Sequence, residues 1–301
     1  MTESNLPEEA AALVREVVGE DWTVEPLPGD ASVRAYYRIR RPGGPSVMLT
    51  WYPAEVREQL GRFLRAYEAV SPHAPVPEVI RASDSSVLQR DVGDRDLFTV
   101  LRENRDEGIR LYRDAIGVLK NFQKASADIN PSFTAEFFFN ELEMTREFYV
   151  EKLAKRDAAP VVPLLREIAE RVASHPYVLC HRDFHGENLH VVNGRLFVID
   201  YQDMRMGPDT YDLASLLRDR GVVGWLGANL ELELVDAYGC PRNRYYEALL
   251  QRSIKILGTW AKQFITRGKE RYLEFIAPTL ESIQRCTEEL PEFRKLGDVF
   301  Q

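Results

Sequence analysis

Short runs of β-branched and aromatic residues dominate the first 92 residues of the chain. Glycine and proline clusters separate these runs, which is typical of strands joined by turns. Two stretches with apolar residues three or four positions apart interrupt the series and predict helices. The predicted strands are 22–27, 35–40, 46–52, 78–82 and 86–89, and the predicted helices are 7–18 and 54–70.

The rest of the chain follows a different pattern, because long amphipathic stretches predict helices over most of it. These stretches are 107–125, 134–156, 161–174, 229–239, 243–266 and 270–289. Three short apolar runs in the middle, at 177–180, 189–192 and 196–200, predict strands, with a hairpin turn at Asn193-Gly194. We therefore expect an α+β protein with a small β-rich lobe over residues 1–92 and a larger, mostly helical lobe over residues 93–301.

The composition is that of an ordinary globular protein and narrows the classes of partner. The chain has 301 residues, 45% hydrophobic and 29% charged, with a formal net charge of −8. Because phosphate contacts need a basic surface, we expect binding neither to nucleic acid nor to an anionic membrane. The three cysteines lack CxxC spacing, and the acidic start lacks the pattern of a signal peptide. We expect a cytoplasmic protein, in a compartment where ATP is available.

The chemistry-bearing residues cluster in one loop between the first two predicted strands of the helical part. The run from His181 to Asn188 reads HRDFHGEN, with a carboxylate at Asp183 and a carboxamide five residues later. Phosphoryl transfer to a hydroxyl needs a group that orients the nucleophile and oxygen ligands for Mg²⁺. Asp183 suits the first role and Asn188 the second. Polar residues also gather in loops for structural reasons alone, so this pattern needs a second motif beside it.

That second motif is Phe197-Val198-Ile199-Asp200, an apolar strand that ends in an aspartate. A single aspartate in this position is more often a cap for a turn or helix. Paired with Asn188, Asp200 becomes a second oxygen ligand for the same Mg²⁺, as in the kinase pattern. The three crowded histidines, His181, His185 and His190, do not match a zinc motif, and we interpret His181 as a structural support for the loop.

Two further segments of the β-rich part suit a nucleotide. The turn Gly29-Asp30-Ala31-Ser32 can cradle phosphates with its N–H groups and hydroxyl, although a plain hairpin turn explains it equally well. The segment from Leu88 to Gly93 joins the two parts of the chain, where a two-lobed kinase binds adenine through its backbone. We expect Gln89, Asp91 and Val92 to contact ATP there, with an interdomain linker as the simpler alternative.

Taken together, these residues resemble the aminoglycoside phosphotransferase and choline kinase-like superfamily, which has a protein-kinase-like fold of two lobes. The closer likeness is to the bacterial anomeric kinases that phosphorylate N-acetylmuramate and N-acetylglucosamine at C1. The segments that carry it are GDASVRAYYRI from Gly29, LQRDVGDRDL from Leu88, HRDFHGENLHVVNGRLFVIDYQDMRMGPDTYDLASLLRD from His181 and QRSIKILGTWAKQFITRGKERYL from Gln251. The resemblance implies that Asp183 is the base, that Asn188 and Asp200 bind Mg²⁺, and that Asp212 holds the catalytic loop.

The third predicted strand departs from the usual pattern of this superfamily. Most relatives carry a lysine there, paired with a glutamate on the next helix, but the strand reads Val47-Met48-Leu49-Thr50-Trp51-Tyr52. The sugar-kinase branch also lacks this lysine. The phosphate charge then needs another cation, and Arg34 and Arg38 are the candidates.

The acceptor should lie between the catalytic loop and the helical lobe. Asp203, Arg205, Glu141 and Trp260 are the candidate contacts, the first two ranked highest because they follow Asp200 closely. A carboxylate there would accept hydrogen bonds from sugar hydroxyls, an arginine could bind a carboxylate, and a tryptophan could stack on a sugar face. A tryptophan on a long helix, such as Trp260, is more often part of the core.

We predict an ATP- and Mg²⁺-dependent kinase that acts as a monomer on a small molecule, an amino sugar. The alternatives are a kinase of an aminoglycoside or amino alcohol and a nucleotide-binding scaffold without activity.

Overall fold

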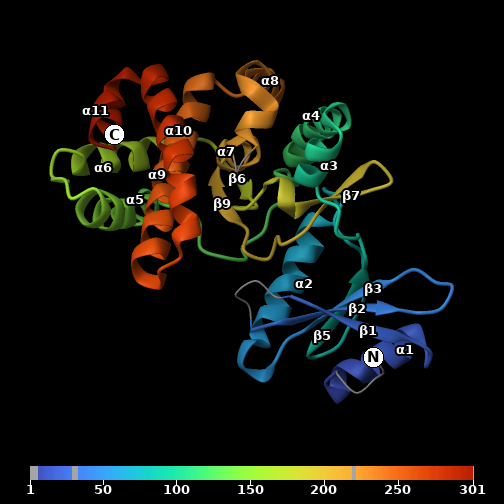
Figure 1. Ribbon diagram of the computed structural model, residues 1–301. Helices are drawn as coiled ribbons and strands as arrows, with labels where there is room; N and C mark the ends of the chain where they lie inside the picture. Colours follow the sequence, from blue (N-terminus) through green and yellow to red (C-terminus); the bar gives the residue numbers. More distant parts are fainter. Residues whose placement is uncertain (1–5, 29–32, 219–221, 301) are drawn as a thin grey trace.

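A computed structural model of the chain describes residues 6–28, 33–218 and 222–300. Its elements form two lobes, a sheet with two helices and a larger helical body, connected by the stretch that leads from β5 into α3 (Figure 1). This is the two-lobed arrangement that the sequence predicts.

The small lobe is built on a five-stranded antiparallel sheet in the order β1-β2-β3-β5-β4. All five predicted strands are confirmed to within one residue at each end. Their bounds are β1 (Thr23–Leu27), β2 (Ala35–Arg40), β3 (Val47–Trp51), β4 (Val79–Ala82) and β5 (Ser86–Arg90). Two helices accompany the sheet, α1 (Glu8–Val18) and α2 (Glu58–Val70), the second preceded by a 3-10 turn, η2 (Ala54–Val56).

The two faces of this sheet have different surroundings: one packs into a core with α1, and the other faces the large lobe. Successive residues of a strand point to opposite faces. Leu49 of β3 is fully buried in a cluster with Leu13 and Val14 of α1, whereas Met48 and Thr50 face the other way. The face away from α1 is therefore the one that can hold a ligand.

The large lobe contains two small β-ribbons among helices. The ribbons pair β6 (Tyr177–Cys180) with β9 (Arg205–Pro208), and β7 (Leu189–Val192) with β8 (Arg195–Val198), both antiparallel. The 3-10 turn η4 (Gly186–Asn188) leads into β7. The hairpin turn at Asn193-Gly194 is confirmed, since both residues have positive φ, 50° and 71°. Sequence periodicity missed β9, because its residues show no alternation.

Long helices form the rest of this lobe, with α9 at the centre and α5, α6, α7 and α10 packed against it (Figure 1). The helices are α3 (Leu97–Glu103), α4 (Arg105–Phe122), α5 (Ala135–Met144), α6 (Val162–Ala173), α7 (Tyr211–Arg218), α8 (Val223–Tyr238), α9 (Arg242–Arg267), α10 (Ile276–Glu289) and α11 (Arg294–Phe300). The π-helix η3 (Thr145–Leu153) continues α5, and 3-10 turns η5 (Glu270–Phe275) and η6 (Pro291–Phe293) flank α10.

The helix ends follow from local sequence. Asp96, Asn104 and Thr134 each accept a hydrogen bond from the N–H three residues later and so begin α3, α4 and α5. Gly268, with φ 62°, ends α9 in the left-handed conformation that glycine allows. The expected helix over 134–156 is interrupted where α5 passes into the wider π-helix. The predicted ranges do not include α3, α7 and α11, because helices of about two turns show too few repeats of the apolar period.

Candidate active site

One buried carboxylate, that of Asp212, holds the backbone at the start of the loop from His181 to Asn188. Asp212, at the start of α7 and fully buried, accepts hydrogen bonds from the backbone N–H groups of His181 at 2.6 Å and Arg182 at 2.9 Å. Arg182 has φ 81°, a strained conformation for a residue with a side chain, and these two bonds hold it there. The predicted role of Asp212 as the support of the loop is confirmed by this geometry.

A histidine connects the loop to the end of the neighbouring ribbon. The Nε2 atom of His181 lies 2.8 Å from the carbonyl oxygen of Ile199, and its ring packs against Phe122 and Phe184. The strand β8 ends at Val198, two residues earlier than the sequence suggests. Asp200 then follows with φ 62°, so its side chain leaves the ribbon at a sharp turn toward the other lobe.

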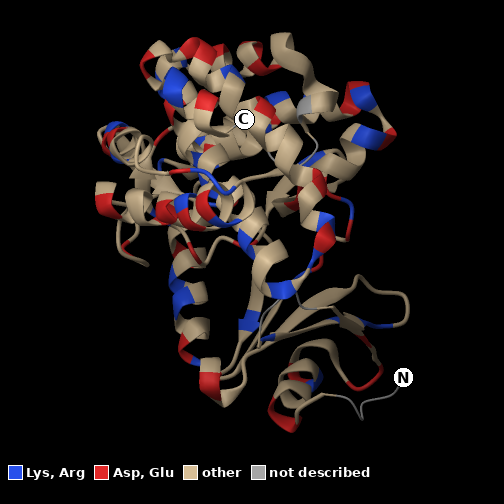
Figure 2. Cartoon of the chain, turned by 60° about the vertical axis from the view of Figure 1, so that its left-hand side comes forward, with Lys and Arg blue, Asp and Glu red and all other residues tan. Residues whose placement is uncertain are grey.

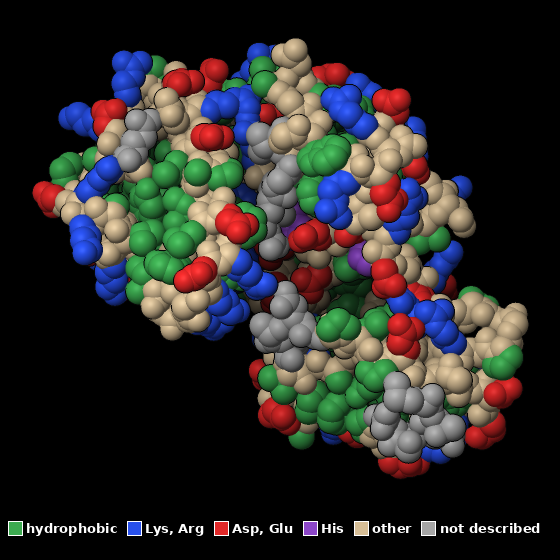
Figure 3. Space-filling model, viewed as in Figure 1, with side chains coloured by type: hydrophobic (Ala, Val, Ile, Leu, Met, Phe, Trp, Pro, Cys, Tyr) green, Lys and Arg blue, Asp and Glu red, His purple; other side chains and the backbone are tan. Residues whose placement is uncertain are grey.

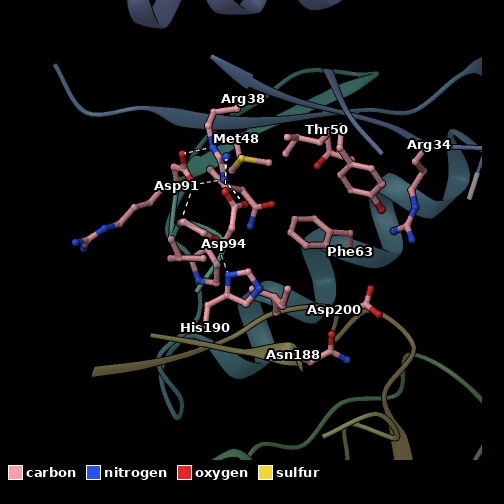
Figure 4. Close-up of a pocket in the computed structure, with 18 of the residues that line it drawn as sticks. Arg34, Arg38, Met48, Thr50, Phe63, Asp91, Asp94, Asn188, His190 and Asp200 are labelled. Carbon is pink, nitrogen blue, oxygen red and sulfur yellow. Dashed lines mark hydrogen bonds and ion pairs between the residues drawn. The ribbon is translucent and has the colours of Figure 1, made fainter. Parts of the chain in front are cut away.

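Asn188 and Asp200 present oxygen atoms to the same wall of the interlobe space (Figure 4). The amide nitrogen of Asn188 donates to the backbone oxygen of Asp183 at 2.9 Å, which turns the amide oxygen away from the loop. Gln202 donates to one oxygen of Asp200 at 2.7 Å. Carboxylate and amide oxygens are the ligands that Mg²⁺ prefers, so this pair fits the predicted ion.

The carboxylate of Asp183 is open to solvent within a dense, cationic surrounding. Burial by the surrounding residues would by itself raise the pKa of Asp183. The positive charges of Arg252 and Lys255 outweigh this effect and hold that pKa below its usual value. Asp183 is therefore ionised at neutral pH and can accept a proton or a hydrogen bond.

A cavity of about 400 Å³ lies between the lobes, in the size range of ligand sites. Figure 3 shows the hollow from outside, with acidic and histidine side chains on its walls. The small lobe contributes Met48, Thr50 and the predicted contacts Arg34, Gln89, Asp91 and Val92, and the large lobe contributes Asn188, His190, Ile199 and Asp200. The structure thus brings the predicted nucleotide and metal residues to one space. The predicted phosphate turn, Gly29 to Ser32, lies outside the described residues.

Arg38 lines the same cavity but is held by the connecting segment. Its guanidinium pairs with Asp91 at 2.7 Å and with Asp94 at 2.7 Å, and only 5% of its side chain is exposed. Ser46 also donates to Asp91, as does the N–H of Gly93. We call Arg38, Asp91 and Asp94 the hinge clasp. Because the carboxylate of Asp91 is taken up in it, only the backbone of Asp91 remains for a nucleotide.

These features coincide with a sequence match over most of the chain. Residues 23–250 match the sequence profile of the phosphotransferase enzyme family. The chain belongs to this family. It is a small-molecule kinase.

Curated relatives of this phosphotransferase carry a more specific name. Proteins named N-acetylmuramate/N-acetylglucosamine kinase are similar to it in Neisseria meningitidis serogroup B and in Pseudomonas putida. The first is 28% identical, over 92% of this chain and 89% of the relative. The second is 27% identical, over 90% and 85%. The similarity therefore covers both lobes.

Solved structures confirm the fold. A gentamicin complex of an aminoglycoside phosphotransferase aligns with a TM-score of 0.61 at 15% identity, over 93% of this chain and 98% of that one. The choline kinase LicA from Streptococcus pneumoniae aligns with a TM-score of 0.60 at 12% identity, over 93% and 97%. At such identities the likeness establishes the protein-kinase-like fold alone.

Several cations of the phosphotransferase lie near Asp183, outside the lining of the cavity. Lys255 of α9 pairs with Glu141 of α5 at 3.1 Å, and Gln251 donates to the same carboxylate. Arg252 donates to the backbone oxygen of Arg182 at 3.3 Å. Burial and the charge of Arg182 lower the pKa of Arg205, while Glu141 and Asp203 act in the opposite direction. We call Arg182, Arg205, Arg252 and Lys255 the cation group.

Sequence reasoning placed Arg205, Asp203 and Glu141 in this region but missed the other members of the cation group. Arg252 and Lys255 are three residues apart on α9, so they share a helix face. They are charged residues within a largely buried stretch of that helix, and Arg252 is itself buried, so a charge inside an apolar stretch is the sequence signal that could have found them. The two charge signs are mixed over the rest of the helical lobe (Figure 2).

Trp260 and Gly258, from the same helix, lie elsewhere in the packing. The ring of Trp260 stacks on Tyr272 at 5.2 Å between centroids and also contacts Phe275. A side chain at Gly258 would meet Thr145 of η3. These contacts give both residues a packing role, and stacking of Trp260 on a sugar stays a prediction. No helix within residues 6–28, 33–218 and 222–300 is long and apolar enough to cross a membrane.

Proposed function

We propose that this chain transfers the γ-phosphoryl group of ATP to the anomeric hydroxyl of an N-acetylhexosamine. The observation that carries the proposal is that Asn188 and Asp200 line an interlobe cavity of nucleotide size, with Asp183 held beside Asn188 by a hydrogen bond from the Asn188 amide to its backbone oxygen. These are the base and the metal ligands that phosphoryl transfer needs. The names of the curated relatives supply the sugar and support the choice of acceptor.

Asn188 and Asp200 would hold Mg²⁺, which supplies charge neutralisation at the phosphates when bound. The backbone from Gln89 to Val92 would bind adenine, with Met48 and Ile199 on either face of the cavity. The acceptor hydroxyl would approach from the side of Asp183. As its oxygen bonds to the γ-phosphorus and the bond to the β–γ bridging oxygen breaks, Asp183 takes up or orients the hydroxyl proton.

The cation group favours an acceptor that is neutral or anionic. The buried Nε atoms of Arg182 and Arg205 have no hydrogen-bond partner among the described residues, and the pKa of Arg205 is lowered by burial and by the charge of Arg182. A carboxylate on the acceptor would satisfy such donors and relieve the repulsion between the two cations. A polycationic aminoglycoside would add to that repulsion. N-acetylmuramate carries a carboxylate, and this agreement supports the sugar over the antibiotic.

An acceptor panel tests the proposal. ATP consumption is measured with N-acetylglucosamine, N-acetylmuramate, free hexoses, choline and aminoglycosides, and the phosphorylated position is assigned by ³¹P and ¹H NMR. We expect turnover with the N-acetylhexosamines and a phosphate at C1. Turnover with an aminoglycoside alone, or a phosphate on any other hydroxyl, would contradict the proposed reaction.

A further inference from the structure

The third strand offers no cation to a bound nucleotide. On β3, Met48 and Thr50 face the cavity, whereas Leu49 is buried under α1. A nucleotide triphosphate carries more negative charge than one divalent ion neutralises, so kinases of this fold use a strand lysine as an additional cation. Thr50, only 6% exposed, cannot provide that charge.

Three arginines and no lysine are among the residues that line the described part of the cavity, and two of the arginines are directed elsewhere. Arg38 belongs to the hinge clasp, where Asp91 and Asp94 neutralise it. Arg90 lies over the ring of Phe197, 5.5 Å from its centroid, at the connecting segment. Arg34 is the third, and it lies at the opposite end of the cavity from the hinge clasp (Figure 4).

The strand register puts Arg34 beside the position of the missing lysine. Tyr36 of β2 pairs directly with Thr50 of β3. Arg34 precedes Tyr36 by two residues, so it faces the same side and is the diagonal neighbour of Thr50. Diagonal Cβ atoms are roughly 7–8 Å apart, which a long side chain can span. An arginine at the start of β2, one residue before the strand begins, can therefore reach the space that a lysine at position 50 would fill.

The side chain of Arg34 points to the metal side of the cavity. Its guanidinium lies over the rings of Tyr36 and Tyr52, 5.7 Å and 6.0 Å from the centroids. Figure 4 shows it directed toward Asp200. Burial raises the pKa of Tyr52 to about 12, and the charges of Arg34 and Asp200 act on the same hydroxyl with opposite sign. Arg34, Tyr52 and Asp200 thus lie close together, and all three line the cavity between the lobes.

We propose that Arg34, the residue just before β2, is the phosphate-binding cation of this enzyme, in place of a lysine on β3. The inference rests on the proposed use of ATP and adds the residue that neutralises its phosphates. A guanidinium binds two phosphate oxygens at once, whereas a lysine binds as a point charge. Tyr36 and Tyr52 hold the guanidinium in place through its flat faces.

Nucleotide binding tests the proposal without any acceptor. Thermal shifts and calorimetric affinities are measured with Mg·ATP and with adenosine, for the wild type, Arg34→Met and Arg40→Met. Arg40 is the matched control, since it ends the strand that Arg34 precedes, is exposed and pairs with Glu25. We expect Arg34→Met to lose at least about tenfold in affinity for Mg·ATP and less than about twofold for adenosine. Equal losses for both ligands, or a loss no greater than that of Arg40→Met, would overturn the assignment.

A second experiment restores the positive charge from the neighbouring strand, β3. Thr50→Lys is introduced into Arg34→Met, so that the cation returns from β3. We expect this double variant to recover at least about tenfold in kcat/KM for ATP over Arg34→Met, because the lysine enters the same space. A double variant no better than Arg34→Met would mean that the lost property is not the positive charge.

These experiments distinguish a failure of the Arg34 assignment from a failure of the proposed function. If the wild type binds Mg·ATP but phosphorylates none of the sugars, the acceptor assignment fails while the binding data still judge Arg34. If the wild type does not bind Mg·ATP, the proposed function fails, and the assignment of Arg34 fails with it.

Discussion

Asp183 combines an open carboxylate with cationic neighbours that keep it ionised. Arg252 and Lys255 lower its pKa against the effect of burial, and Asn188 is hydrogen-bonded to its backbone. Asp212 and His181 set the position of the loop that carries Asp183 and Asn188, and neither of them lines the cavity. At the scale of single residues, the site therefore depends on a few buried polar contacts beneath the loop.

Replacing the proposed base should remove chemistry and keep binding. We expect Asp183→Asn to lower kcat by about 10²–10⁴-fold with little change in the affinity for Mg·ATP, because the amide cannot accept the proton. Asp84→Asn, in the exposed turn between β4 and β5, is the control. Steady-state kinetics measure kcat, and calorimetry measures the affinity for Mg·ATP. Unchanged kcat in Asp183→Asn would remove the assignment.

The low pKa of Asp183 also has a consequence for the pH profile. Since the group stays ionised above its lowered pKa, it should produce no inflection in kcat between about pH 5 and 8. An inflection in this interval that disappears in Asp183→Asn would contradict the stated electrostatics.

At the scale of elements, α9 serves the site and the core at once. One part of it supplies Arg252 and Lys255, and its next turn packs so closely on η3 that only glycine fits at position 258. Thr145 of η3 donates to the backbone oxygen of Ile254 at the same crossing. The close approach of α9 and η3 therefore sets where the two cations lie.

Two glycine substitutions separate packing from helix propensity. A Cβ at Gly258 would lie 2.6 Å from the backbone nitrogen of Thr145, whereas a Cβ at Gly117 in α4 meets no heavy atom within 4 Å. We expect Gly258→Ala to lower the free energy of unfolding by about 1–3 kcal/mol through overpacking. Gly117→Ala should raise it by up to about 1 kcal/mol through helix propensity. Urea unfolding measures both, and equal effects of the two would contradict the close crossing.

At the scale of the whole molecule, the hinge clasp joins β2 of the small lobe to the segment that leads into the large one. Arg38 lies 53 residues from Asp91 in the chain, and their side chains are 5% and 6% exposed. His190 of β7 reaches the backbone oxygen of Gly93 at 2.6 Å on the other side. The segment between the lobes is thus held from both directions.

Removing the cation of the clasp should destabilise the protein in a pH-dependent way. We expect Arg38→Met to cost roughly 3–5 kcal/mol at neutral pH, because it leaves the Asp91 carboxylate buried without its partner. Hydrogen bonds from Ser46 and Arg38 outweigh burial and lower the pKa of Asp91, so the stabilisation is present above the unfolded-state pKa and is lost as the pH falls through the folded-state pKa. The difference from wild type should therefore shrink below about pH 4.

Urea unfolding at neutral and acidic pH provides the comparison, with Arg40→Met expected to cost less than about 1 kcal/mol. A penalty for Arg38→Met that does not change with pH would show that the clasp acts through packing and not through charge.

The proposed metal ligands, Asn188 and Asp200, would connect the two lobes through the nucleotide. Saturating Mg·ATP at about 100 times its Kd should stabilise the fold by about 2.7 kcal/mol. We expect Asp200→Asn to keep the shift in melting temperature caused by ATP alone and to lose the additional shift caused by Mg²⁺. Differential scanning fluorimetry with and without Mg²⁺ measures this, with Asp84→Asn as control. A retained Mg²⁺ increment would exclude Asp200 as a ligand.

The sequence by itself determined the two-lobe division, the five strands of the small lobe and the positions of Asp183, Asn188 and Asp200. These features are local. The alternation of a strand can be recognised within five residues, and the three site residues lie within one loop and the hairpin that follows it. The short separation of these three residues in the sequence is therefore enough to place them near one another, whatever the packing of the rest of the chain.

Only the tertiary structure decided which distant residues surround that loop. The pairing of β6 with β9, the arrival of Arg252 and Lys255 from α9, and the pairing of Arg38 with Asp91 all join segments far apart in the chain. No local periodicity encodes such contacts, because they depend on how helices and sheet pack. The same packing directs Arg38 into the hinge clasp and leaves Arg34 facing Asp200. The sequence alone cannot make this distinction between two arginines four residues apart.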